Sequence, residues 1–297
     1  MDNKSTFGIL KMYIFLGGIK MKNKIIAVMT LTVLLCCLTG CKADKQKKAD
    51  LLVIGSDMVD INVVVPSEYQ DLGFGIPVLW RNEKAPTFKL LDVKGENISL
   101  DEVEISDDTI KDYKDVTFDD CYLSLIGVKI YFQQRVNFTI ESMKVQIYGK
   151  EYDIVFDKKI QYRFADDNKE IEQLTTPDVI LPDNSYDLLF SFETNKQVHN
   201  VKVDVSKQLE YKGLFKGEEQ QPITTNVLAD KIGKGEQMSF RLQVDQPAES
   251  KYMSGAYNVV LNYQTKSNEE KTCYYMFNKQ CVSAEEDVEA VIRHLYK

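Results

Sequence analysis

The stretch that decides the fold is YDLLFSFET, residues 186–194, in which Leu188, Phe190 and Phe192 fall at every second position. Successive side chains of a β-strand point to opposite faces, so this period of two indicates a strand with one buried face. The same period recurs in VKVDVSK (Val201, Val203, Val205), in MSFRLQV (Met238, Phe240, Leu242, Val244) and in YNVVLNY (Tyr257, Val259, Leu261, Tyr263). Short strands separated by polar turns predict an antiparallel β-sandwich.

Upstream of residue 165 the same alternation predicts further strands. It places apolar residues at Ile61, Val63 and Val65, at Met143, Val145 and Ile147, at Tyr152, Ile154 and Phe156, and at Ile160, Tyr162 and Phe164. Residues 148–151, YGKE, separate two of these runs and indicate a hairpin turn. Residues 121–132, CYLSLIGVKIYF, are almost continuously apolar. That run indicates one strand buried on both faces, or a pair of strands interrupted at Gly127.

The alternation of apolar and polar residues stops at residues 166–176, DDNKEIEQLTT, and Pro177 and Pro182 follow. A charged segment without alternation, followed by prolines, is typical of a link between domains. We therefore expect a first β-sandwich over residues 51–165 and a second over residues 177–297. The chain is long enough for both.

The end of the chain carries the one clear helical pattern. Ser283 and Glu286 form a capping box, and an apolar stripe then follows at helical spacing: Val288, Val291, Ile292 and Leu295. We expect a short amphipathic helix that packs this stripe onto the second sandwich. The predicted fold class is thus all-β, with two antiparallel immunoglobulin-like β-sandwich domains and a C-terminal helix.

Tyr257 follows the turn-forming pair Ser254-Gly255 and opens an alternating strand. This arrangement resembles the tyrosine corner of immunoglobulin-like domains, where the hydroxyl hydrogen-bonds back to the preceding loop. Cysteines and tryptophan at immunoglobulin spacing are missing, so the resemblance extends to the sandwich architecture only.

The N-terminal region has the layout of an export signal. Residues 21–24, MKNK, are basic, residues 25–38 are apolar, and Thr39-Gly40-Cys41 follows. The apolar core is shorter than the ~20 residues of a membrane-spanning helix, so we expect residues 21–40 to be a cleaved signal peptide. Residues 1–20 do not fit this layout and are predicted to be an extension upstream of the true start at Met21.

Leu38-Thr39-Gly40-Cys41 resembles the lipobox of bacterial lipoproteins. The resemblance implies that the Cys41 thiol is alkylated by diacylglycerol, whose acyl chains include fatty acids such as palmitate, and that the chain is then cut just before Cys41, because the family is anchored in this way. Two acyl chains give stable attachment to a membrane. Residues 41–50 would then be a solvated tether, and the folded part would lie on the extracytoplasmic face of the cell membrane.

Charge and cysteine content narrow the remaining possibilities. The chain has a formal net charge of −8, and without residues 1–41 the charge is −12, which argues against nucleic acid as a partner. Apart from Cys41 and the two signal-peptide cysteines, three remain: Cys121, Cys273 and Cys281. Cys273 and Cys281 are a possible disulfide, and two unpaired thiols are the alternative.

The sequence contains no motif for a catalytic nucleophile, a nucleotide or another cofactor. It has only two histidines, His199 and His294, and this small number argues against histidine-based zinc sites and triads. An acidic stretch offers oxygen ligands for calcium: Asp107, Asp108, Asp112, Asp115, Asp119 and Asp120. It lacks the spacing of a calcium-binding loop, so a solvated acidic loop is the better interpretation. We predict no catalytic residue, metal or cofactor.

These observations favour a non-enzymatic binding or adaptor module for an unknown extracellular protein or glycan. The alternative is a cell-envelope glycan hydrolase that uses paired carboxylates, whose partnership is spatial and leaves no sequence motif. Aromatic residues for carbohydrate stacking would be Trp80, Tyr263, Tyr274 and Tyr275, with packing inside the sandwich as the alternative. A transporter's solute-binding protein is disfavoured because helical patterns are nearly absent.

Overall fold

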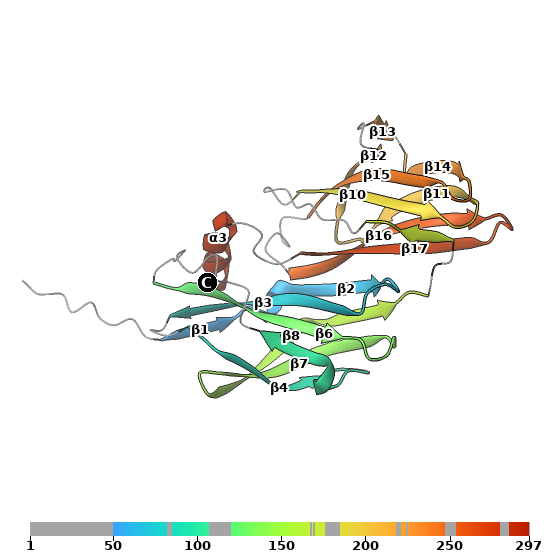
Figure 1. The fold of residues 1–297 in the computed structure, drawn as a ribbon. Coiled ribbons are helices and arrows are strands. Elements are labelled where there is room, and N and C mark those ends of the chain that lie inside the picture. The colour runs from blue at the N-terminus through green and yellow to red at the C-terminus, as the bar shows by residue number, and fades with distance from the viewer. Residues whose placement is uncertain are drawn as a thin grey trace, which may run out of the picture. The chain divides into compact units, whose positions relative to one another are not determined.

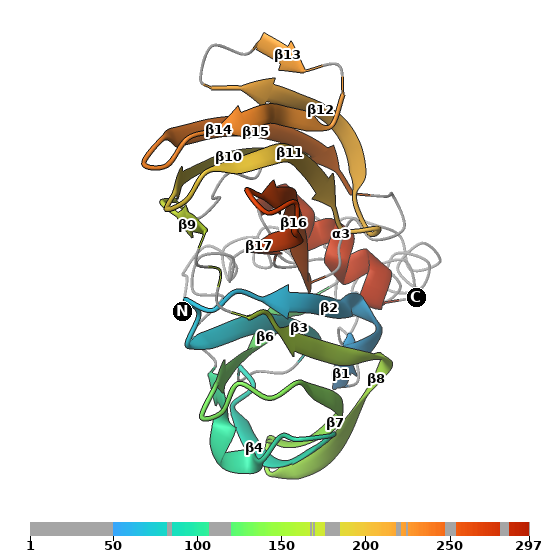
Figure 2. The same ribbon diagram turned by 90° about the vertical axis from the view of Figure 1, so that its right-hand side faces the viewer.

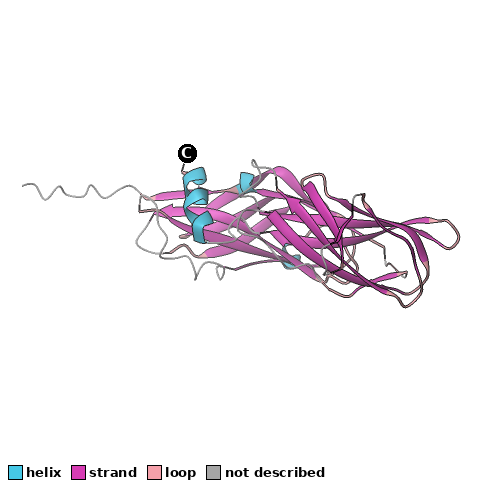
Figure 3. Ribbon diagram, turned by 90° about the horizontal axis from the view of Figure 1, so that it is seen from above, coloured by secondary structure: helices cyan, strands magenta, loops and turns pink. Residues whose placement is uncertain are grey.

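The computed structural model describes residues 50–81, 85–106, 120–166, 168, 170–175, 185–217, 221–223, 225–246, 254–279 and 285–296. The part of the chain from Asp50 onwards forms one compact unit. Its described residues are mostly β-strand with one α-helix near the C-terminus, which confirms the predicted fold class (Figures 1 and 3). The predicted signal peptide and Cys41 lie outside the described residues.

Two sheets are built from the strands that precede residue 165. One has the order β1-β3-β6-β5: β1 (Leu51–Ile54), β3 (Asp71–Arg81), β6 (Tyr122–Tyr131) and β5 (Val103–Ser106). The other contains β2 (Val59–Val65), β8 (Lys150–Phe164), β7 (Phe138–Ile147) and β4 (Phe88–Lys94), in that order, and is part of an eight-stranded sheet that continues beyond β2 into strands that follow residue 165. Two short 3₁₀ helices, Ser56–Met58 and Leu100–Glu102, lie between strands. We call the elements that precede residue 165 the first half.

The strands that follow residue 165 form two layers, and we call them the second half. A five-stranded sheet has the order β13 (Gln221–Ile223), β12 (Glu210–Lys216), β15 (Gln237–Asp245), β10 (Ser185–Thr194) and β9 (Ile171–Gln173). The facing layer contains β14 (Val227–Ile232), β11 (Val198–Val205), β16 (Ser254–Thr265) and β17 (Glu270–Lys279). Figure 2 shows these two layers above β2.

The period-two pattern correctly marks the buried faces. Ile61, Val63 and Val65 are buried in the first half, and Leu188, Phe190 and Phe192 are buried in the second. Tyr148 and Gly149 connect β7 to β8 with φ angles of 51° and 78°. A two-residue turn with both φ angles positive matches the twist of a hairpin, so the predicted turn is confirmed.

The apolar run at residues 121–132 is one strand, β6, because different layers cover its two faces. Leu123 and Leu125 pack under the C-terminal helix, whereas Ile126, Val128 and Ile130 belong to the main core of the first half. This is the first of the two arrangements that the sequence allowed.

The C-terminal helix α3 (Glu285–Leu295) packs onto the first half. Its stripe at Val288, Val291, Ile292 and Leu295 is buried, as the spacing predicts. The partners of the stripe are Leu79 of β3 and Leu123 and Leu125 of β6, with Met58 and Cys121 beside them. The expected packing onto the second sandwich is therefore wrong. The reason is that one face of β6 carries the apolar side chains of Leu123 and Leu125, and helix α3 covers them.

One feature absent from the sequence patterns is a parallel junction between the halves. The first residues of β2 pair in parallel with β16, and its last residues pair in parallel with β8. Beyond the paired residues of β16, the side chain of Asn258 continues the ladder. It accepts from the Val64 N–H at 2.8 Å and donates to the Val64 carbonyl at 2.7 Å. Asn258 thus supplies one donor and one acceptor, as a strand residue would.

The predicted link at residues 166–176 contains the short strand β9, which pairs with β10. Most members of the two large cores come from either side of this link. Ala256 and Met276 of the second half nevertheless belong to the core of the first. The division into residues 51–165 and 177–297 stays a prediction.

Tyr257 lies where a tyrosine corner would place it. Its ring is buried, and its hydroxyl accepts a hydrogen bond from the Nε2 of Gln246, which follows β15. The bond therefore returns to the preceding loop through a side-chain amide. The Tyr186 hydroxyl donates to the same Gln246, to its Oε1 at 3.2 Å, so this residue serves two tyrosines of the second core.

Candidate functional site

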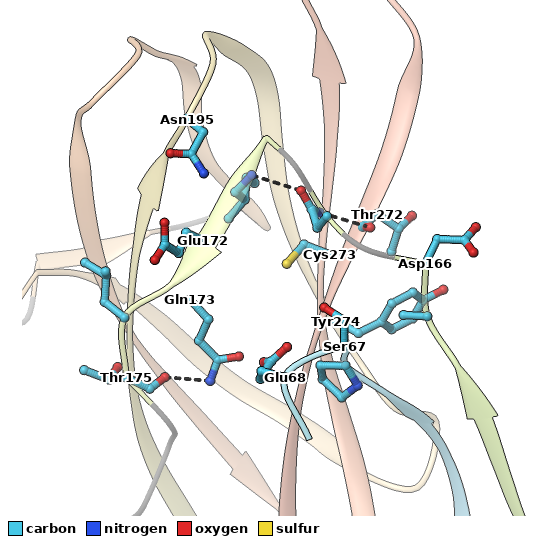
Figure 4. A pocket seen from close by; sticks show the side chains of 15 residues that line it. Ser67, Glu68, Asp166, Glu172, Gln173, Thr175, Asn195, Thr272, Cys273 and Tyr274 are labelled. Carbon is cyan, nitrogen blue, oxygen red and sulfur yellow. Dashed lines mark hydrogen bonds between the residues drawn. The ribbon is translucent and has the colours of Figure 1, made fainter. Parts of the chain in front are cut away.

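A pocket of about 520 Å³ lies where the ends of β2 and β8 meet β9 and β17 (Figure 4). Its lining residues come from four segments: Pro66, Ser67 and Glu68; Ala165, Asp166 and Asn168; Ile171 to Thr175 with Asn195; and Thr272, Cys273 and Tyr274. We call it the junction pocket. Its volume falls in the range of small-ligand sites, ~300–1,000 Å³.

The loop after β2, which carries Glu68, is held by Arg135. The guanidinium donates to the carbonyls of Val65 and Pro66 and to those of Ser67 and Tyr69, at 2.8–3.3 Å. It also lies over the Phe164 ring, 4.6 Å from the ring centroid. Five donors in a rigid fork suit this set of carbonyls, so Arg135 fixes one wall of the pocket.

Asn168 holds the opposite wall together. Its Oδ1 accepts from the backbone N–H groups of Glu170 and Ile171, at 3.0 and 2.9 Å, and from the Tyr263 hydroxyl at 3.1 Å. Its Nδ2 donates to the Thr272 carbonyl at 3.4 Å. One side chain therefore joins β9 to β17. An asparagine that bonds the backbone two residues on is a common turn former.

Three carboxylates line the pocket: Glu68, Asp166 and Glu172. Within the described part of the chain none of the three has an ion pair or hydrogen-bond partner. Nearby Glu170 differs, because Lys196 and Lys271 lie 3.1 and 3.5 Å from its Oε1. Burial acts to raise the pKa of Glu170, but these two lysines outweigh burial and lower it. Figure 4 shows Glu172 and Asp166 on opposite sides of the pocket, with Glu68 below them.

Two buried acceptor atoms near the pocket also have no partner among the described residues: the Oε1 of Gln173 and the hydroxyl of Tyr275. Gln173 lines the pocket, and its Nε2 donates to the Thr175 carbonyl at 2.7 Å. Burial raises the pKa of Tyr275, and Cys273 and Glu68 raise it further. Buried polar atoms are normally paired, so such atoms call for an explanation.

Cys273 has a buried thiol that forms no disulfide within the described residues. Burial, with a smaller contribution from Glu68, raises its pKa to about 12. A thiol protonated at neutral pH is a poor nucleophile, so Cys273 is a packing residue at this pocket. Cys281 lies outside the described residues, and the Cys273–Cys281 disulfide stays a prediction.

The aromatic residues predicted for carbohydrate stacking are mostly in the core. Tyr263 and Tyr275 are buried, and Trp80 stacks on Tyr122 with 4.7 Å between ring centroids. Tyr274 alone among the four lines the junction pocket. Five residues of the predicted acidic stretch, Asp107, Asp108, Asp112, Asp115 and Asp119, lie outside the described residues. The described residues contain no cluster of carboxylate, thiol and imidazole groups arranged to hold a metal ion.

The sequence patterns did not point to Glu68, Asp166 or Glu172. These residues lie in three segments separated by up to about a hundred residues, and each is an ordinary loop or strand-edge carboxylate in the sequence. They come together because the parallel junction brings the end of β2 beside β17. A period-two pattern predicts strands and not which strands pair.

No protein-family model matches this chain, and no curated protein sequence matches it. Among solved structures, collagen adhesin (CNA) from S. aureus is 10% identical, with a TM-score of 0.26, and the match covers 78% of this chain and 94% of that one. The major pilin SpaD from Corynebacterium diphtheriae is 9% identical, with a TM-score of 0.26 and coverage of 80% and 68%.

A family 123 glycoside hydrolase from Clostridium perfringens is 16% identical, with a TM-score of 0.21. That match covers 32% of this chain and 20% of the hydrolase, so this chain spans about a fifth of that protein's length. Each TM-score is below 0.5, and the fold assignment therefore rests on the strand pairing described above. None of the helices in the described residues has the length and apolar composition to cross a membrane.

Proposed function

We propose that this chain is a lipid-anchored protein on the extracytoplasmic face of a cell membrane, and that it binds a partner without catalysing a reaction. One observation carries the proposal for binding: the junction pocket is lined by three carboxylates that have no partner among the described residues. Unpaired polar groups in a concave site are available to a ligand. Hydrogen bonds from Arg135 and Asn168 join the segments that line the site, so its shape does not depend on a ligand.

Binding fits the geometry better than glycan hydrolysis does. A glycosidase needs two carboxylates on either side of one bond, at most about 9.5 Å apart, one of them as an acid. In Figure 4 the three carboxylates surround the pocket and do not point toward one another. The described lining residues include no histidine, lysine or arginine to act as a second acid or base.

The anchor rests on Leu38-Thr39-Gly40-Cys41 and the basic and apolar segments before it. Cells that express the full chain would be fed an alkyne-tagged palmitate and the protein tested for the tag. We expect labelling of the wild-type protein and of Cys36→Ala, and loss of labelling in Cys41→Ser. Labelling of Cys41→Ser at the wild-type level would contradict the anchor.

Binding at the pocket is tested separately with a photo-crosslinking amino acid in intact cells. Thr272 is an exposed residue that lines the pocket, and Asp157 is an exposed residue in the middle of β8. We expect a discrete adduct from position 272 and none of the same mass from position 157. The absence of any adduct at position 272, or the same adduct at both positions, would contradict a partner at this pocket.

A further inference from the structure

We infer that one end of the first half lies against the phospholipid headgroups of the membrane that holds the chain, and that tyrosine and tryptophan side chains make this contact. The inference rests on the proposed lipid anchor and adds to it the orientation of the protein on the membrane. It draws on the length of the tether, on the side chains that gather where the tether joins the fold, and on the position of the junction pocket.

The tether between the lipid and the fold is short. With the lipid on Cys41, nine residues follow before the first strand begins at Leu51. Nine residues span at most about 32 Å when fully extended, and about 15–18 Å on average as a flexible chain. The start of β1 therefore stays near the membrane, and the part of the fold around it faces the headgroups.

The end of β3, the start of β6 and the last turn of helix α3 meet where β1 begins. Leu51 pairs with Arg81, the last residue of β3. Trp80, beside it, stacks on Tyr122 at the start of β6, with 4.7 Å between ring centroids. The Arg81 guanidinium donates to the Tyr296 hydroxyl at 3.5 Å and lies 5.8 Å from the centroid of its ring. Figure 1 shows β1 and α3 at the same end of the fold.

The hairpin turn between β7 and β8 lies at this end as well. The pKa of Tyr148 is raised to about 12, mainly by burial and further by the nearby Asp50 and Tyr152. Asp50 directly precedes β1, so the turn is close to the point where the tether joins the fold. We give the name aromatic end to the tryptophan and tyrosine side chains of these segments: Trp80, Tyr122, Tyr148, Tyr152 and Tyr296.

The chemistry of the aromatic end suits a membrane–water interface. Tyr296 is 45% exposed, the other three tyrosines are half-buried, and Trp80 is 9% exposed. Each ring is apolar and carries one polar group, and such side chains concentrate at the headgroup level of membranes. Arg81 adds a cation on an apolar stem, which lies along the rings while its charge meets a phosphate. This end therefore fits a layer of phospholipid headgroups.

The contact depends on the rings and not on net charge. Exposed residues of both signs lie in the same segments: Lys150 and Glu151 begin β8, and Glu289 pairs with Arg293 on α3. A surface without an excess of positive charge has no general attraction to anionic lipids. We therefore expect contact with a zwitterionic headgroup such as phosphatidylcholine, and little change in this contact with salt.

This orientation directs the junction pocket away from the membrane. Strand β8 begins at the hairpin of the aromatic end and finishes at Phe164, next to Ala165 of the pocket. Strand β7 pairs along β8 from Ile147 to Phe138, and these 10 residues span about 30 Å at ~3.3 Å per residue. The pocket then lies about this far from the headgroups, where a partner in the aqueous phase reaches it.

Tryptophan fluorescence locates the end that meets the lipid. Trp80 is the single tryptophan of the chain, so Trp80→Phe gives a background into which one tryptophan is placed. Tyr296→Trp reports on the aromatic end, and Tyr211→Trp on β12 is the matched control, since these tyrosines are 45% and 44% exposed. The lipidated full chain would be reconstituted in phosphatidylcholine vesicles, with and without a nitroxide on the headgroup.

We expect the nitroxide to reduce the fluorescence of the Tyr296→Trp protein at least about twofold, and that of the Tyr211→Trp protein by less than about a tenth. The quenching should be the same at low and high salt. Equal quenching of the two proteins, or quenching that disappears at high salt, would overturn the inference.

The role of the rings is tested with Trp80 itself as the reporter. Tyr296→Ser removes the most exposed ring of the aromatic end, and Tyr211→Ser removes a ring of similar exposure elsewhere. The ratio of emission with and without nitroxide corrects for any change in Trp80. We expect Tyr296→Ser to reduce the quenching about twofold and Tyr211→Ser to leave it unchanged. Equal quenching in the wild type and both variants would mean that the tether alone holds this end near the lipid, and would overturn the contact.

The anchor and the orientation fail separately. A lipidated chain floats with the vesicles in a density gradient. A chain that does not float would remove the anchor and this inference together. A chain that floats, with no quenching in the Tyr296→Trp protein, would remove the orientation and leave the anchor.

Discussion

The two halves of the molecule have cores of different chemistry. The first is mainly aliphatic, with Ile61, Val63, Val65, Ile76, Val78, Ile126, Ile140 and Ile160 among its members. The second is rich in aromatic residues: Tyr186, Phe190, Phe192, Phe240, Tyr257, Tyr263, Tyr275 and Phe277. Phe190 is central to it, since its ring stacks on Phe240 and meets Tyr275 edge-on, with centroids 4.9 and 5.2 Å apart.

This difference shows where polar groups enter the structure. An aliphatic core needs only shape and volume, whereas each buried tyrosine brings a hydroxyl that requires a partner. Tyr257 has Gln246 and Tyr263 has Asn168, while Tyr275 has none among the described residues. The second core therefore depends on individual hydrogen bonds, and the bond from Tyr263 to Asn168 connects it to the junction pocket.

The largest perturbation is to cut the chain between the two halves. We expect limited proteolysis to cleave first within residues 166–176, where charge interrupts the strand pattern. The fragments should still elute together in gel filtration, because β2–β16 pairing and helix α3 hold the halves together. First cuts within residues 198–205 or 238–245, identified by mass spectrometry, would show that the predicted division is wrong.

The aromatic core is tested at Tyr257. Replacement by alanine removes a fully buried ring and should lower the free energy of unfolding by about 3–5 kcal/mol. Replacement by phenylalanine keeps the ring and loses the bond from Gln246, at a cost of about 0.5–1.5 kcal/mol. Urea melts of the full chain measure both. A change below about 1 kcal/mol for Tyr257→Ala would mean that the ring is exposed.

The packing of helix α3 is tested at Ile292. Because this side chain is fully buried against the first half, Ile292→Ala should lower stability by about 2–5 kcal/mol. The single tryptophan, Trp80, follows Leu79, which contacts the helix stripe, so its fluorescence should change as well.

Phe240→Leu, in the second core, is the matched control for Ile292→Ala. It should lower stability while leaving the native fluorescence of Trp80 unchanged, because Phe240 belongs to a different core. An unchanged Trp80 fluorescence in Ile292→Ala would contradict the packing of helix α3 against Leu79.

The fold could be predicted from the sequence wherever a local pattern determines the structure. Alternation identified the buried faces of β2, β10 and β16, and the Tyr148-Gly149 turn followed from a glycine between two alternating runs. Helix α3 was predicted by its apolar stripe. Its partner was not, because a stripe shows that a face is buried and not which surface buries it.

The parallel junction and the pocket could not be predicted for a related reason. Asn258 sits in a strand pattern as an ordinary polar residue, and its role depends on β2, almost two hundred residues away. The pocket requires Glu68, Glu172 and Tyr274 to meet, and only the pairing of β2 with β16 brings their segments together. Long-range pairing of this kind has no local signature.

The central claim is that the two halves share one sheet through β2, β16 and Asn258, and amide hydrogen exchange of Asn258→Ala tests it most directly. The variant removes the acceptor of the Val64 N–H and should cost about 1–3 kcal/mol, whereas a control at the exposed Asn278 of β17, Asn278→Ala, should cost less than about 0.5 kcal/mol. We predict faster exchange at Val64 in the first half as well as in β16 and β17. Unchanged exchange at Val64, with faster exchange in the second half alone, would contradict the shared sheet.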